Sequence, residues 1–90
     1  MGIALVKIKI MPESPASNLK QIEDKAQAEI TKEGGKGVRF SEEPIAFGLK
    51  AVFVSFEWPE EKELEILEAK LGKIKDVKSA EVADIRRAIG

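Results

Sequence analysis

The spacing of the apolar residues changes period along this chain, and the order of these changes constrains the fold more than any other feature. Residues 3–11 alternate between apolar and polar, as in a β-strand with one buried face. From residue 19 to residue 33 the apolar residues recur every three or four positions, as in an amphipathic helix. Two more strands are expected: 38–46, which is weakly patterned and carries Pro44, and 49–58, which is apolar on both faces along much of its length. A second helical spacing follows Pro59, and a short last strand is expected at 78–85.

Proline and glycine mark the boundaries between these segments. Pro12 and Pro15 stop the first strand, because proline has no N–H to donate to a neighbouring strand. Ser17 or Asn18 can then cap the helix, which Gly34-Gly35 ends. Pro59 is tolerated in the first turn of the second helix, and Gly72 is the expected stop.

The resulting order is strand, helix, strand, strand, helix, strand. With right-handed crossovers it closes as a four-stranded antiparallel sheet with both helices on one face, an α+β ferredoxin-like sandwich. Ninety residues suffice for one domain, residues 1–90, with one core. The third strand should be the most enclosed, because it is apolar on both faces. One-sided apolar faces are expected in the first strand (Ala4, Val6, Ile8, Ile10), the first helix (Leu19, Ile22, Ala26, Ile30) and the second helix (Leu64, Leu67, Leu71). In the third strand Leu49, Ala51 and Phe53 point one way, and Val52, Val54, Phe56 and Trp58 the other.

The composition argues against an enzyme. The chain has no cysteine and no histidine, which removes thiol nucleophiles, disulfides, the usual zinc sites and histidine acid–base catalysis. The acidic residues from Glu60 to Glu68 fall at helical spacing and indicate a solvated face, while the side chains of Glu42 and Glu43 should point apart. The glycines at 34–37 lack the spacing of a phosphate-binding loop. We therefore expect no catalytic residues, metal or cofactor.

Charge bears on partners and location. The formal net charge of -1 gives no basic excess, which disfavours direct binding to nucleic acid. Lys7 and Lys9 interrupt the first apolar stretch, so it reads as a strand and not as a signal peptide, and no apolar run approaches membrane-spanning length. A soluble, cytoplasmic protein is expected. Abundant Lys and Glu with few amides are typical of proteins from hot environments.

The link between the second and third strands carries an aromatic residue in an unusual place. Phe47 precedes Gly48 where the chain must turn back, although hairpin turns usually carry Asn, Asp or Gly. Gly48 can supply the backbone freedom. Two interpretations of Phe47 are open: it folds over the edge of the sandwich, or it anchors a partner.

The C-terminal end carries two of the three arginines, Arg86 and Arg87. One interpretation is a solvated, frayed terminus. The other is a cation presented to a carboxylate or a phosphate, for which guanidinium is preferred to ammonium.

A binding module for RNA or a small effector is the alternative function for this topology. Phe53-Val54-Ser55-Phe56 imitates the end of an RNA-recognition signature. The preceding residues lack its glycines, and the first strand has no aromatic residue. Phe53 and Phe56 are better interpreted as packing residues of a central strand.

Three stretches together resemble the archaeal family of translation elongation factor 1-beta: Met11 to Pro15, Glu43 to Ala51, and Glu81 to Arg87. The resemblance covers essentially the whole chain and implies the ferredoxin-like fold. It also implies an activity without bond chemistry, which is to speed GDP release from GDP-bound elongation factor 1-alpha so that GTP can rebind.

The resemblance assigns roles to two places in this sequence. The aromatic between the middle strands would dock on the second domain of elongation factor 1-alpha, a role that falls on Phe47 with its neighbours Pro44, Ile45 and Gly48. A basic residue near the C-terminus would disturb the magnesium at the nucleotide site, which points to Arg87, with Arg86 beside it. The eukaryotic relatives have lysine at that position, and the stretch Trp58 to Glu61 also departs from the usual archaeal pattern.

Overall fold

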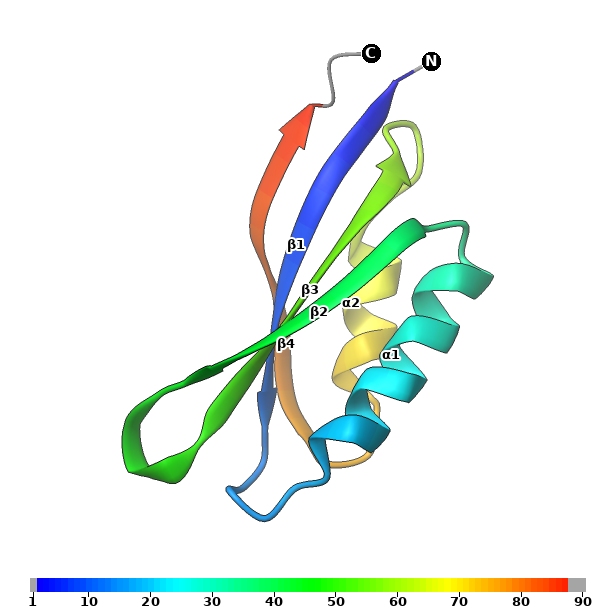
Figure 1. Ribbon diagram of the computed structural model, residues 1–90. Coiled ribbons are helices and arrows are strands. Elements are labelled where there is room, and N and C mark those ends of the chain that lie inside the picture. Colours follow the sequence, from blue (N-terminus) through cyan, green and yellow to red (C-terminus); the bar gives the residue numbers. More distant parts are fainter. Residues whose placement is uncertain (1, 88–90) are drawn as a thin grey trace.

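The structure is a computed structural model in which residues 2–87 are described. Its four strands form one antiparallel sheet in the order β2-β3-β1-β4, and both helices lie on one face of it (Figure 1). The predicted α+β ferredoxin-like fold is confirmed. The elements are β1 (Ile3–Pro12), α1 (Leu19–Lys32), β2 (Lys36–Pro44), the 3-10 turn η1 (Ala46–Gly48), β3 (Lys50–Pro59), α2 (Glu65–Gly72) and β4 (Val77–Arg87).

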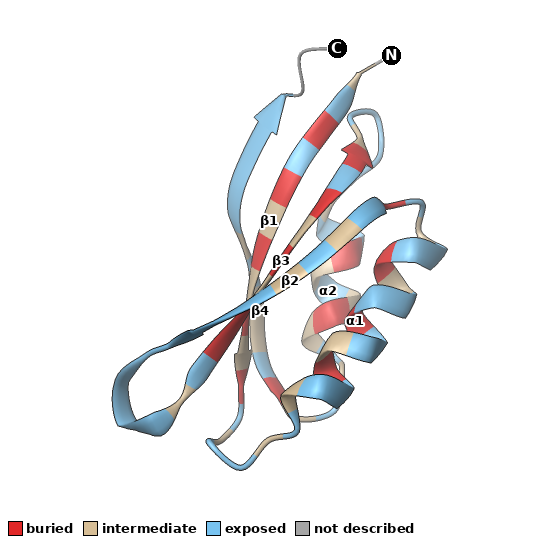
Figure 2. Ribbon diagram, in the orientation of Figure 1, coloured by how far each residue is buried: buried red, intermediate tan, exposed pale blue. Residues whose placement is uncertain are grey.

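The core lies between the helices and the two central strands, β1 and β3 (Figure 2). Ile8 and Val54 face each other in register, and both are fully buried. Alternate residues of β1 are buried in the same way as those of β3, so the expectation that β3 alone would be the most enclosed strand is wrong. Being central to the sheet encloses a strand as much as its own composition does.

Helix α1 begins and ends where the sequence predicts. Of the two candidate caps it uses Asn18, whose Oδ1 accepts a hydrogen bond of 3.1 Å from the Gln21 N–H. The apolar stripe is buried at Ile22, Ala26 and Ile30. Beyond the helix the buried Gly35 donates to the carbonyl of Ile30 at 2.8 Å, which turns the chain into β2.

The second helix begins later than predicted. Pro59 is not in a first helical turn: it ends β3, paired with Ile3. A turn follows, in which the Lys62 N–H donates to the Pro59 carbonyl at 3.1 Å and the Trp58 indole N–H donates to the Lys62 carbonyl at 3.1 Å. These bonds hold residues 60–62 outside the helix, so only Glu65 and Glu68 of the acidic run lie in its first turn.

The last strand is longer than predicted, and this changes the setting of both terminal arginines. β4 continues to Arg87, where Arg86 pairs with Leu5 and Arg87 with Ala4. The expectation of a strand ending at 85 is therefore wrong, because β1 offers backbone partners up to that point. The terminal stub at 88–90 lies outside the described residues.

Both edge strands differ in detail from the expectation. β2 starts at Lys36 and ends at Pro44, because residues 45–49 close the turn instead of extending the strand. Proline at the end of an edge strand leaves no donor unpaired.

β4 carries a bulge, since Lys7 pairs with Asp84 and Ile8 with Val82. The carboxylate of Glu68 accepts the Val82 N–H at 3.0 Å.

An ion pair joins the end of α1 to α2 and should make stability depend on pH. Lys70 Nζ lies 2.6 Å from Glu33 Oε2, and its hydrogen bond and charge lower the pKa of Glu33 below the ordinary value. A carboxylate with a lowered folded pKa stabilises the protein above its unfolded pKa, and this contribution is lost as the pH falls through the folded pKa. Glu33→Gln should therefore lower the melting temperature near neutral pH and have no such effect at about pH 2. Thermal unfolding of both proteins at the two pH values checks this, and an equal difference at both would contradict it.

Candidate functional site

The hairpin tip, residues 45–49, holds Phe47 away from the core. The Ile45 N–H donates to the Leu49 carbonyl at 2.8 Å, and the Leu49 N–H donates to the Ala46 carbonyl at 3.2 Å. Between them Phe47 has φ 60° and ψ 33°, and its surface is 93% exposed. It does not fold over the edge of the sandwich. A left-handed conformation costs a non-glycine residue about 1–2 kcal/mol, so neither packing nor backbone preference explains an aromatic here.

The residues beside Phe47 extend this apolar surface. Ile45 is 36% exposed, and Pro44 and Gly48 are exposed as well. Gly48 has φ 76°, a conformation that glycine adopts without strain. The structure therefore places all four predicted partner-binding residues, Pro44, Ile45, Phe47 and Gly48, on one protruding tip.

A fifth residue, Pro15, adjoins the tip from the loop after β1. A methyl group on Gly48 would lie 3.9 Å from Pro15 Cβ, so the two most specific sequence stretches meet in space. Sequence reasoning missed this contact, although it had singled out both stretches. We call Pro15, Pro44, Ile45, Phe47 and Gly48 the tip surface.

The loop that carries Pro15 is fixed by hydrogen bonds. The Ser17 N–H donates to the Ser14 carbonyl at 3.1 Å, and the Ser14 N–H donates to Ser17 Oγ at 3.2 Å. The Glu13 N–H donates to the Asp76 carbonyl at 2.8 Å, which ties the loop to the start of β4. Pro15 is thus presented beside the tip by an ordered turn.

Arg86 and Arg87 form what we call the basic end, and they point to opposite faces of the sheet. Arg86 pairs with Leu5 on the open face, where its Nε lies 2.8 Å from Asp84 Oδ2. Arg87 pairs with the buried Ala4 on the helix side, and its Nε lies 2.7 Å from Glu60 Oε2. Both side chains are mostly exposed. Of the predicted solvated, frayed terminus, the solvation is confirmed for these two side chains, and the fraying is wrong because both residues belong to a paired strand.

The structure does not bring the tip surface and the basic end together. β3 starts directly after the tip at Lys50 and ends at Pro59, which pairs with Ile3 next to the partner of Arg87. A ten-residue strand spans about 33 Å, and the longest dimension of the molecule is 42 Å. The two places therefore lie at opposite ends of the sheet (Figure 1).

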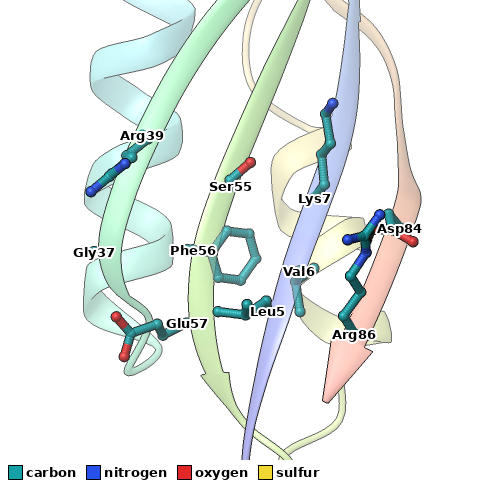
Figure 3. A pocket seen from close by; sticks show the side chains of 10 residues that line it. All are labelled: Leu5, Val6, Lys7, Gly37, Arg39, Ser55, Phe56, Glu57, Asp84 and Arg86. Carbon is teal, nitrogen blue, oxygen red and sulfur yellow. Dashed lines mark hydrogen bonds and ion pairs between the residues drawn. The ribbon is translucent and has the colours of Figure 1, made fainter. Parts of the chain in front are cut away.

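The open face of the sheet carries a shallow hollow of about 410 Å³ that includes Arg86 of the basic end. Its rim is charged, with Lys7, Arg39, Glu57, Asp84 and Arg86 around Leu5 and Ser55 (Figure 3). Along β1, Lys7 Nζ lies 4.7 Å from the centre of the Phe53 ring. Phe56 packs in the core as predicted, whereas Phe53 is half-buried on the open face.

The acidic residues next to the tip separate as the sequence predicts. Glu43 pairs with Ala51, and Glu42 faces the helix side near Glu23. Partial burial raises the pKa of Glu23, and the hydrogen bond and charge of Glu42 raise it further.

Within residues 2–87 no group of three or more acidic side chains is arranged to hold a metal ion. In the same range no helix is both long and apolar enough to cross a membrane.

The sheet thus presents an exposed aromatic side chain at one end and two exposed arginine side chains at the other. Residues 5–88 match the EF-1 guanine nucleotide exchange domain. The chain belongs to this family of exchange domains, and a GTPase partner follows from that membership.

Relatives along nearly the whole chain carry the name elongation factor 1-beta. The protein from Methanothermobacter thermautotrophicus is 40% identical over 88 residues, which cover 97% of this chain and 98% of the relative. The protein from Methanocaldococcus jannaschii is 35% identical over 89 residues, or 98% and 100% of the two chains. The protein from Methanococcus vannielii is 34% identical over 86 residues, or 94% and 97%. The resemblance drawn from the three sequence stretches is confirmed.

Proposed function

We propose that this protein promotes GDP release from elongation factor 1-alpha, so that GTP can rebind during peptide-chain elongation. Residues 1–90 would act as a single exchange domain in the cytoplasm, without bond chemistry of their own. The family match supports the activity. The observation that carries the contact is Phe47, 93% exposed in a strained conformation at the hairpin tip.

The tip surface supplies the docking contact in this proposal. The closed turn fixes the backbone around Phe47, so the ring can enter a pocket on a partner without first ordering a loop. Aromatic residues of this kind often contribute most of an interface's binding energy. Pro15 and Ile45 would surround the aromatic and exclude water from its contact.

The basic end supplies the destabilising contact. Magnesium bridges phosphate oxygens and protein ligands in nucleotide sites, so a cation brought close to it weakens the hold on GDP. A guanidinium is suited to pair with a carboxylate or a phosphate oxygen, whereas an ammonium is a compact point charge. Arg87 would act here by pairing with such an oxygen. The exchange activity lowers the kinetic barrier to GDP release. It leaves the overall affinities of elongation factor 1-alpha for GDP and GTP unchanged.

The test is the release of a fluorescent GDP analogue from purified elongation factor 1-alpha, with excess unlabelled nucleotide present. Addition of this protein should raise the release rate in a saturable manner. A release rate that stays constant at every concentration of this protein would overturn the proposal.

Arg87→Ala should lower the maximal release rate by about tenfold, the value of one hydrogen bond to a charged group. Arg86→Ala is the matched control, since Arg86 is equally exposed but faces the other side of the sheet. Arg86→Ala should lower the maximal release rate by a smaller factor than Arg87→Ala. Neither change should alter the melting temperature much, because exposed ion pairs contribute little to stability. A larger loss for Arg86→Ala would transfer the role to that residue.

A further inference from the structure

Three segments distant in sequence meet at the basic end. The turn after β3 is joined to the start of the chain, since the Glu60 N–H donates to the Gly2 carbonyl at 3.0 Å. Beside it, β4 ends with Arg87 paired to Ala4 of β1. Gly2, Glu60 and Arg87 therefore share one corner of the sheet.

The contact between Glu60 and Arg87 is asymmetric. Glu60 Oε2 lies 2.7 Å from Arg87 Nε, and the Glu60 side chain is 28% exposed while that of Arg87 is 80% exposed. The Glu60 side chain is thus less exposed than that of Arg87, which extends into solvent. Arginine has five N–H donors in a planar group, so a bond at Nε restrains the plane and leaves other donors available to a second acceptor.

Gly2 makes room for this carboxylate. A Cβ atom at residue 2 would overlap Glu60 Oε1 and crowd its carboxyl carbon. Because the carboxyl group is the end of a flexible side chain, it would swing away at small cost and leave Arg87. A change at residue 2 can thus move Glu60 without altering any charge.

We propose that Glu60 is a positioning residue for Arg87, which it holds through Nε so that the rest of the guanidinium faces an oxygen acceptor of the partner's nucleotide site. This inference rests on the proposed function. Because the bond to Glu60 already restricts the Arg87 side chain, binding of its guanidinium to the acceptor costs less conformational entropy. Loss of Glu60 should therefore lower the maximal release rate and leave the concentration of this protein at half-maximal rate unchanged, because that concentration depends mainly on the tip surface.

The test is a double-mutant cycle measured by release of the fluorescent GDP analogue. Glu60→Ala should lower the maximal rate about two- to fivefold, the range supported by a partly exposed ion pair. The same change in an Arg87→Ala background should have no further effect. Glu61→Ala, in the same turn, is the matched control and should leave the rate unchanged. Gly2→Ala should reproduce part of the loss.

Two kinetic outcomes overturn the inference: an unchanged or raised rate in Glu60→Ala, or an equal loss in the Arg87→Ala background. A second readout needs no partner, namely solvent exchange of the Arg87 Nε–H measured by NMR. That proton should exchange more slowly in the wild type than in Glu60→Ala, and equal exchange rates overturn the inference as well. If the wild type does not accelerate GDP release, the proposed function fails, and this NMR comparison still decides whether Glu60 holds Arg87.

Discussion

Phe47→Ala should reduce the rate at which a fixed low concentration of this protein releases GDP from elongation factor 1-alpha by about 30-fold or more. The basis is the loss of about 2 kcal/mol or more when a central aromatic anchor is removed from an interface. Phe47 is 93% exposed, so no packing inside the protein is lost with the ring. The loss should appear as a higher concentration needed for half-maximal release, because the role proposed for the ring is docking.

Matched variants separate docking from folding. Phe47→Leu keeps an apolar side chain and should retain part of the activity. Phe47→Gly should lose activity like Phe47→Ala while it melts at the same or a higher temperature, because glycine adopts a φ of 60° without strain. Release rates measured over a series of concentrations, together with thermal unfolding, give both quantities. Normal release by Phe47→Ala would remove the tip surface from the mechanism and leave the exchange activity itself untouched.

Ile8→Ala should destabilise the fold by about 2–5 kcal/mol. Ile8 is fully buried in β1, opposite Val54 of the other central strand and next to β4 on its other side. Removal of three carbon atoms there leaves a cavity that rigid sheet neighbours cannot fill. The measurement is the free energy of unfolding from denaturant titration at constant temperature.

Leu5→Ala is the control in the same strand. Leu5 faces the open side of the sheet and is 47% exposed, so its truncation creates no closed cavity. It should cost well under half as much as Ile8→Ala. Similar losses for the two variants would mean that the helix side of β1 is not the centre of the core.

The fold followed from local spacing wherever a segment's own residues decide its structure. The alternation in β1 and the stripe of Ile22, Ala26 and Ile30 predicted buried faces that the structure confirms. The wrong predictions concern segments whose structure depends on pairing with residues distant in the sequence. Pro59 belongs to β3 because Ile3 pairs with it, and β4 reaches Arg87 because β1 extends alongside. No local pattern contains those partners.

The candidate site was likewise predicted only in part from the sequence. An aromatic in a hairpin turn was noticeable from sequence, yet only the structure shows that Phe47 stays off the sandwich edge. Pro15 next to Gly48, and Glu60 next to Arg87, join residues 33 and 27 positions apart. Such neighbours depend on how the hairpin and the sheet ends align, which residue types alone do not specify. That Phe47 and Arg87 act on the same partner stays a prediction.

The separation of the hairpin tip from the last residues of β4 also limits how this domain can change over evolutionary time. An antiparallel hairpin keeps the same side chains on the same face only if each strand gains or loses residues in pairs. Each such step displaces the turn by about 7 Å, since a strand rises about 3.4 Å per residue. The span between the tip surface and the basic end can therefore take only values that differ by about 7 Å. If both places contact the same GTPase, as proposed, a change of one or two ångströms between its contact regions would have to be accommodated by side chains and not by the sheet.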